Sequence, residues 1–143
     1  MVEIVFPGTP ISRKSFRSFI SNHRIKIIDP QSKELMQYKI IAISQIPEDH
    51  FIWAKDIPVY VCINCHFSIP KNWTKDAKSI AIKNYIPYIH APDCDNIAKF
   101  FMDVIKGIVF EDDRQVETLT ITKSYSTEPE VRIICKQTIE GIK

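Results

Sequence analysis

The sequence predicts a single α+β domain in which helices pack on one face of a small mixed β-sheet. Segments with the composition of strands lie at both ends of the chain, with helical patterns between them, and this order is typical of α+β proteins. The chain has 143 residues, of which 45% are hydrophobic, which suits one domain with one core over residues 1–143.

The first half of the chain is expected to contribute two main strands and one helix. Residues 2–6 indicate a strand that ends at a turn rich in proline. Residues 12–17 have no regular period and are expected to form a mobile basic loop, followed by a short strand at residues 26–28. A helix is expected from Ser32 to near Pro47. Residues 58–69, rich in Val, Tyr and Ile, predict the best-defined strand.

The second half is expected to contribute two helices and a closing pair of strands. Residues 71–83 predict a basic helix whose lysines line its outer side. Apolar residues at positions 97, 100, 101, 104, 105 and 108 follow the period of a helix that Gly107 would end. Residues 118–123 and 131–136 predict the final two strands.

Composition excludes several classes of protein. No apolar run approaches the about 18 residues that a membrane-spanning helix needs, and Glu3 stands where a signal peptide carries basic residues. Four cysteines are too few for a disulfide scaffold, which favours a reducing compartment. We therefore expect a cytoplasmic protein that does not bind membranes.

Charge is divided unevenly along the chain. Residues 93–117 contain seven acidic and three basic side chains, whereas the remainder contains ten acidic and sixteen basic ones. Residues 13–26 contain five bases and no acid. A basic chain with one acidic segment suits a protein that binds a polyanion such as nucleic acid and also holds cations. Charge segregation without a function is the alternative interpretation.

The acidic segment places carboxylates around a predicted helix. Asp93 and Asp95 lie two residues apart in a segment expected to be extended, so both side chains are expected to point the same way. Asp95 is also the expected N-cap of the helix, and Lys99 and Asp103 fall on the same helical face. We further expect the turn at residues 111–113 to return to the helix N-terminus after the chain reverses at Gly107.

A cluster of this kind predicts a site for hard cations. Two unit charges about 5 Å apart repel by roughly 3 kcal/mol at an effective dielectric constant near 20, so converging carboxylates need cations. Oxygen ligands favour Mg²⁺, with Mn²⁺ as a substitute, over Zn²⁺. Beside a lysine, such a metal suits phosphoryl chemistry. The alternative is a solvated acidic turn next to an ordinary helix.

Residues 90–99, with the sequence His-Ala-Pro-Asp-Cys-Asp-Asn-Ile-Ala-Lys, resemble the P-D-x-D-N-x-x-K signature of RusA-type Holliday junction resolvases. Residues 101–116 resemble the segment of the same family that ends in D-D-x-Q-V. The resemblance is close over residues 90–116 and looser at residues 6–10 and 67–83. One departure is Pro92, which stands where some members of the family carry a basic residue.

The resemblance implies a RusA-like Mg²⁺-dependent endodeoxyribonuclease that resolves four-way DNA junctions by paired nicks in DNA recombination and repair. It also implies a homodimer, encoded by a bacterium or a phage. Carried over position by position, it makes Asp93, Asp95 and Asp113 the metal-binding catalytic carboxylates and Lys99 the catalytic lysine, while Asp103 and Asp112 match acidic family positions without an essential role. With this resemblance, the basic side chains expected to bind DNA are Arg13, Lys14, Arg17, Lys71, Lys75 and Lys78.

Other interpretations stay open from the sequence. A catalytically silent protein that binds branched DNA on the same scaffold is the main alternative, and a structural protein that binds divalent cations is another. Cys62 and Cys65 have the C-x-x-C spacing of zinc ligands. On a strand, however, these two side chains point to opposite faces, so ordinary thiols are expected instead.

Overall fold

The computed structural model describes residues 1–138, except for the side chain of Arg17. Its main sheet has four strands in the order β1-β6-β4-β5. β1 (Val2–Pro7) and β4 (Val59–Ser68) both run antiparallel to β6 (Glu130–Gln137), while β5 (Val116–Ser126) runs parallel to β4. The mixed sheet confirms the predicted α+β class.

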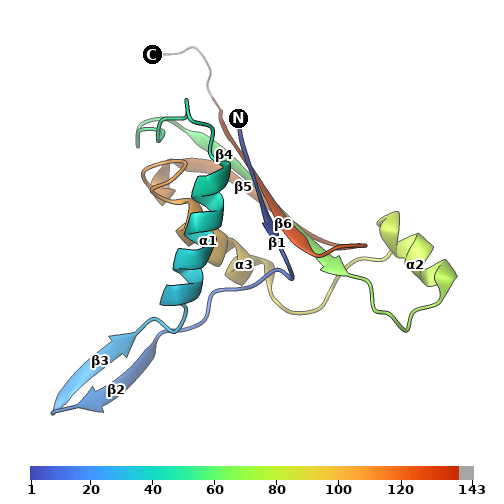
Figure 1. Ribbon diagram of the computed structural model, residues 1–143, viewed down its shortest axis with the longest axis horizontal. Coiled ribbons are helices and arrows are strands. Elements are labelled where there is room, and N and C mark those ends of the chain that lie inside the picture. The colour runs from blue at the N-terminus through green and yellow to red at the C-terminus, as the bar shows by residue number, and fades with distance from the viewer. Residues whose placement is uncertain (139–143) are drawn as a thin grey trace.

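Two helices cover one face of this sheet (Figure 1). They are α1 (Ser32–Gln45) and α3 (Cys94–Ile105), which also pack on each other. A shorter helix, α2 (Lys75–Ile82), lies beyond the carboxyl end of β4 (Figure 1). In the part of the chain that the structure describes, no helix has the length and apolar character needed to cross a membrane.

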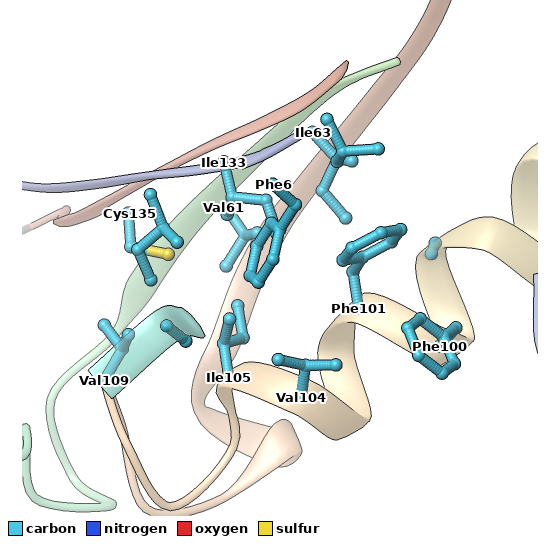
Figure 2. Packing of buried hydrophobic residues seen from close by; sticks show 14 of the residues in the cluster. Phe6, Val61, Ile63, Phe100, Phe101, Val104, Ile105, Val109, Ile133 and Cys135 are labelled. Carbon is cyan, nitrogen blue, oxygen red and sulfur yellow. The ribbon is translucent and has the colours of Figure 1, made fainter. Parts of the chain in front are cut away.

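The core forms between the sheet and α3. β4 alternates buried and half-buried residues along its length, because successive side chains of a strand point to opposite faces. Figure 2 shows side chains of three strands pointing toward Phe101 and Ile105 of α3. The rings of Phe6 and Phe101 pack with their centroids 5.2 Å apart. The buried stripe of α3 consists of Ile97, Ala98, Phe100, Phe101, Val104 and Ile105.

The basic segment near the N-terminus forms more regular structure than expected. β2 (Arg17–Ser21) and β3 (Arg24–Ile28) pair as an antiparallel hairpin, so the mobile loop expected over residues 12–17 ends where β2 begins. Asn22 and His23 form the turn with φ of 50° and 61°, and a two-residue hairpin turn often needs positive φ at both positions. The hairpin was not predicted from the sequence because such a turn usually contains glycine, and Asn22-His23 contains none.

The boundaries of α2 also differ from the expected helix over residues 71–83. α2 begins at Lys75, since the side chain of Thr74 accepts a hydrogen bond from the backbone N of Ala77 at 3.2 Å and caps the helix. Lys71 therefore lies in the turn before the helix, where the Trp73 N–H donates to the carbonyl of Pro70.

Candidate active site

The first half of the predicted site lies at the N-terminal end of α3. Asp93, Asp95 and Lys99 are all exposed, on the side of the helix opposite the stripe that packs on the sheet. Asp95 and Lys99 are one helical turn apart, so they are neighbours on one face. The sequence therefore predicted correctly that these two groups share a ridge.

The cap of α3 is Asp93 rather than the expected Asp95. Asp93 has φ −71° and ψ 147°, whereas Asp95 already belongs to the first helical turn. The argument that the two carboxylates point the same way along an extended segment is therefore wrong. The side chain of Asp93 makes no capping hydrogen bond, which leaves its oxygens available to a ligand.

Lys123 holds the segment that leads into α3. Its ammonium donates to the carbonyl oxygens of His90 at 2.7 Å and Pro92 at 2.9 Å. Lys123 is half-buried on β5, so it joins the sheet to the residues just before Asp93. Sequence analysis missed this positioning residue because a single lysine in a strand carries no motif.

Asp113, the remaining carboxylate of the predicted site, lies near the C-terminal end of α3. The chain reverses tightly, because the Gly107 N–H donates to the Phe110 carbonyl at 2.8 Å and the Glu111 N–H donates to the Trp53 carbonyl at 3.1 Å. Asp113 Oδ2 lies 3.8 Å from Nζ of Lys106, the residue that follows α3. The expectation that this turn returns to the helix N-terminus is wrong.

The lengths of α3 and β5 show how far Asp113 lies from Asp93 and Asp95. α3 has 12 residues, a length of about 18 Å at 1.5 Å per residue. Asp113 begins the short turn of residues 113–115 that leads into β5, whereas Lys123, which binds Pro92, lies about 23 Å along the strand from Val116 at 3.3 Å per residue. In residues 1–138, no three His, Cys, Asp or Glu side chains are placed to hold one metal ion. The described part of one chain therefore does not form the predicted three-carboxylate site.

The turn that carries Asp113 is built by its neighbours. The Asp112 carboxylate accepts from the Arg114 N–H at 2.9 Å, and Gln115 Oε1 accepts from the Asp112 N–H at 2.8 Å. Hydrogen bonds from Arg114 lower the pKa of Asp112. The buried amide of Gln115 donates to the carbonyls of Trp53, Ala54 and Ile57. Asp112 is thus committed to the turn, whereas the carboxylate of Asp113 is 46% exposed.

Arg13 is enclosed by acidic partners. Its side chain is 10% exposed, with the guanidinium 2.7 Å from Asp29 Oδ2 and 3.2 Å from Asp103 Oδ2. Its backbone N–H donates to the carbonyl of Asn96 in α3 at 2.9 Å. The hydrogen bonds from Arg13 lower the pKa of Asp29. These contacts favour a role for Arg13 in fixing the N-terminal segment against α3.

The other residues expected to bind DNA form two groups on opposite sides of the molecule (Figure 1). Lys14 is exposed next to the β2–β3 hairpin, and Arg17 begins the hairpin, although its side chain lies outside what the structure describes. Lys71 and Lys75 are exposed at α2, where Lys78 is half-buried.

The cysteines behave as ordinary thiols. Cys62 is half-buried and Cys65 is buried, in agreement with their placement on opposite faces of β4. Burial raises the pKa of Cys65 and of Cys135 to about 12, so both stay protonated at neutral pH. Zinc binding by the C-x-x-C pair finds no support among residues 1–138.

Two comparisons with known proteins cover nearly the whole chain. The family model described as Endodeoxyribonuclease RusA matches residues 7–136, a range that includes both halves of the predicted site. The Bacillus subtilis (strain 168) protein called "Uncharacterized protein YqaN" is 29% identical over 133 residues, which cover 91% of this chain and 92% of that relative.

Proposed function

This chain belongs to the endodeoxyribonuclease RusA family, and from that membership we propose that it resolves four-way DNA junctions by paired, Mg²⁺-dependent nicks in DNA recombination and repair. The family implies endodeoxyribonuclease activity on branched DNA. The observation that carries the proposal is the extent of the family match, which runs through Asp93, Asp95, Lys99 and Asp113. We place the enzyme in the cytoplasm, where a bacterial or phage-encoded resolvase meets its substrate.

The proposed roles follow from the chemistry of each side chain. Asp93, Asp95 and Asp113 offer exposed carboxylate oxygens, which are ligands suited to Mg²⁺ and, as a substitute, to Mn²⁺. A bound divalent metal supplies Lewis acidity and an activated water. The ammonium of Lys99, one turn from Asp95, is proposed to offset negative charge that develops on the scissile phosphate.

The separation of the two halves supports a proposed homodimer. Asp113 lies at the end of α3 opposite to Asp93 and Asp95 in one chain. A two-fold pair of copies presents every surface twice, so the partner's Asp113 can complete each site. Such a dimer also provides two sites of matching orientation, as paired nicks on opposed strands require.

Mixing two inactive variants tests both the residues and the dimer. Asp93→Asn and Asp113→Asn are each expected to abolish nicking of a synthetic four-way junction in Mg²⁺ while leaving junction binding intact. Their mixed dimer contains one site in which both carboxylates are native, so mixing is expected to restore single nicks. Asp76→Asn, at an exposed aspartate of α2, is the matched control and is expected to cut normally.

Different results separate the alternatives. An inactive mixture of the two variants would show that the carboxylates act within one chain, and Mg²⁺-dependent nicking by either variant alone would remove that residue from the site. Wild-type protein that binds junctions and never cuts them would support the silent DNA-binding protein. Absence of salt-dependent affinity for DNA would instead support a structural cation-binding protein.

A further inference from the structure

The β2–β3 hairpin projects from the domain (Figure 1), and several of its apolar side chains are exposed to solvent. Ile20 is 78%, Ile25 is 75% and Ile27 is 71% exposed, and none of the hydrophobic side chains described in the hairpin belongs to the core cluster or packs against it. A two-stranded hairpin is at best marginally stable alone in water. Contiguous exposed apolar side chains on such an arm indicate a contact surface.

The register of the hairpin gives it two different faces. Ile20 lies opposite Ile25, and Phe19 lies opposite Lys26. Because side chains alternate along each strand and cross-strand partners share a face, these two pairs lie on opposite faces. The apolar face carries Ile20, Ile25 and Ile27, while the other face carries Phe19, Arg24 and Lys26.

The charge of the arm is complementary to a polyanion. Residues 13–28 contain no acidic side chain. Asp29, the first acid after the hairpin, is already paired with Arg13. Arg24 and Lys26 are exposed and share a face of the hairpin with Phe19. This composition favours DNA over an apolar protein surface, because the cations would lose hydration there without gaining a counter-charge.

The base of the hairpin is clamped to the domain. Gln31 is 1% exposed, and its side chain accepts from the Lys14 N–H at 2.6 Å and donates to the Ser12 carbonyl at 2.8 Å. Arg13, which joins the two ends of the hairpin through Asp29, also contacts α3. The direction of the arm is therefore set relative to the helix that carries the proposed catalytic lysine.

We propose that this hairpin is a DNA-deforming arm, in which Arg24 and Lys26 contact phosphates while Ile20 and Ile25 insert against unstacked bases at the branch point. The inference rests on the proposed function for its substrate. Each strand has five residues and extends about 17 Å, which exceeds the about 8.5 Å depth of the major groove, a groove wide enough to admit a two-stranded ribbon. Isoleucine is among the side chains that proteins wedge between base steps.

Isoleucine variants test the insertion. Ile20→Ser combined with Ile25→Ser is expected to weaken binding to a four-way junction at least tenfold and to leave binding to linear duplex unchanged. A 2-aminopurine base at the branch point, which brightens when it unstacks, is expected to brighten with wild type and to stay dim with the variant. Ile40→Ser combined with Ile43→Ser is the matched control, since these exposed isoleucines lie on α1.

Charge variants test the phosphate contacts. Arg24→Gln and Lys26→Gln are each expected to reduce the slope of log affinity against log salt by about 0.9. Lys33→Gln, at an exposed lysine of α1, is expected to leave the slope unchanged. Unchanged slopes for both hairpin variants would overturn the assignment of phosphate contacts to this arm.

Further outcomes test the proposed role of the hairpin separately from the proposed nuclease activity. Isoleucine variants that bind and unstack the junction like wild type would overturn the arm and leave the nuclease standing. A change in sedimentation of these variants before DNA is added would assign the apolar face to a second copy of the chain and overturn the arm. Wild type that uses the arm to bind junctions but never cuts them would refute only the nuclease, and wild type without affinity for DNA would refute both.

Discussion

The buried amide of Gln115 makes the clearest quantitative prediction from this structure. Replacing it with methionine keeps the length of the side chain and removes all of its hydrogen bonds. Gln115 Nε2 lies 2.9 Å from the Ile57 carbonyl, 3.0 Å from that of Ala54 and 3.3 Å from that of Trp53, and Oε1 accepts from the Asp112 N–H. The variant therefore leaves several backbone groups without a partner.

The magnitude follows from the number of protons available. An amide has two donor hydrogens, so three carbonyl contacts amount to two full hydrogen bonds. Together with the bond that Gln115 accepts, three bonds are lost at about 1 kcal/mol each, and the free energy of unfolding is expected to fall by about 3 kcal/mol. For a domain of this size the corresponding drop in Tm is about 6–12 °C.

Urea unfolding measures this loss as a lower midpoint with an unchanged m-value. Gln37→Met, at an exposed glutamine of α1, is the control and is expected to change stability little. Gln115→Glu is expected to lower the free energy of unfolding more than Gln115→Met does at pH 7, because a carboxylate that faces carbonyl oxygens cannot donate a hydrogen bond to them. A loss below about 1 kcal/mol for methionine, or a glutamate variant as stable as the methionine variant, would refute the reasoning.

Three further predictions concern ionisable groups. Arg13 lowers the pKa of Asp29 from its ordinary value of 3.8, so the stability that this carboxylate contributes is complete above that value and is lost as pH falls through the lowered pKa. The Tm of wild type should therefore fall below about pH 4 more steeply than the Tm of Asp29→Asn. Parallel curves of Tm against pH would contradict this. Cys65 and Cys135, whose pKa values burial raises to about 12, should react with iodoacetamide at pH 8 more slowly than the other two cysteines, as mass spectrometry can resolve; equal rates would argue against their burial. Lys99→Ala should slow nicking by about 100-fold with junction affinity nearly unchanged, and a defect that lies wholly in affinity would remove its proposed role.

Local patterns in the sequence were sufficient to predict the elements that build the core. The alternation of β4 and the helical spacing of α3 are visible in the chain because one face of each element is buried against the other. The spacing of Asp95 and Lys99 is likewise local, since one helical turn separates them whatever the rest of the fold does. The family resemblance lay in the same stretch of chain.

Other features depend on conformations that the sequence signals weakly. The β2–β3 hairpin turns at Asn22-His23 without a glycine, so its two strands were not recognised as a pair. α3 begins one residue after Asp93, which changed the direction expected for the Asp95 carboxylate. Arg13, expected to contact DNA, is instead enclosed between Asp29 and Asp103, which lie far from it in the sequence.

The sequence by itself determined which acidic and basic groups this protein carries and which of them share a helix face, because those relations depend only on local geometry. Tertiary structure decided that Asp113 lies at the opposite end of α3 from Asp93. That separation is set by the hydrogen bonds from Gly107 to Phe110 and from Glu111 to Trp53. They hold the turn at the C-terminal end of the helix, so the chain returns toward the helix N-terminus only after Asp113, as β5. The second of these bonds joins distant parts of the chain, and such long-range pairings leave no periodic trace in the residues that make them.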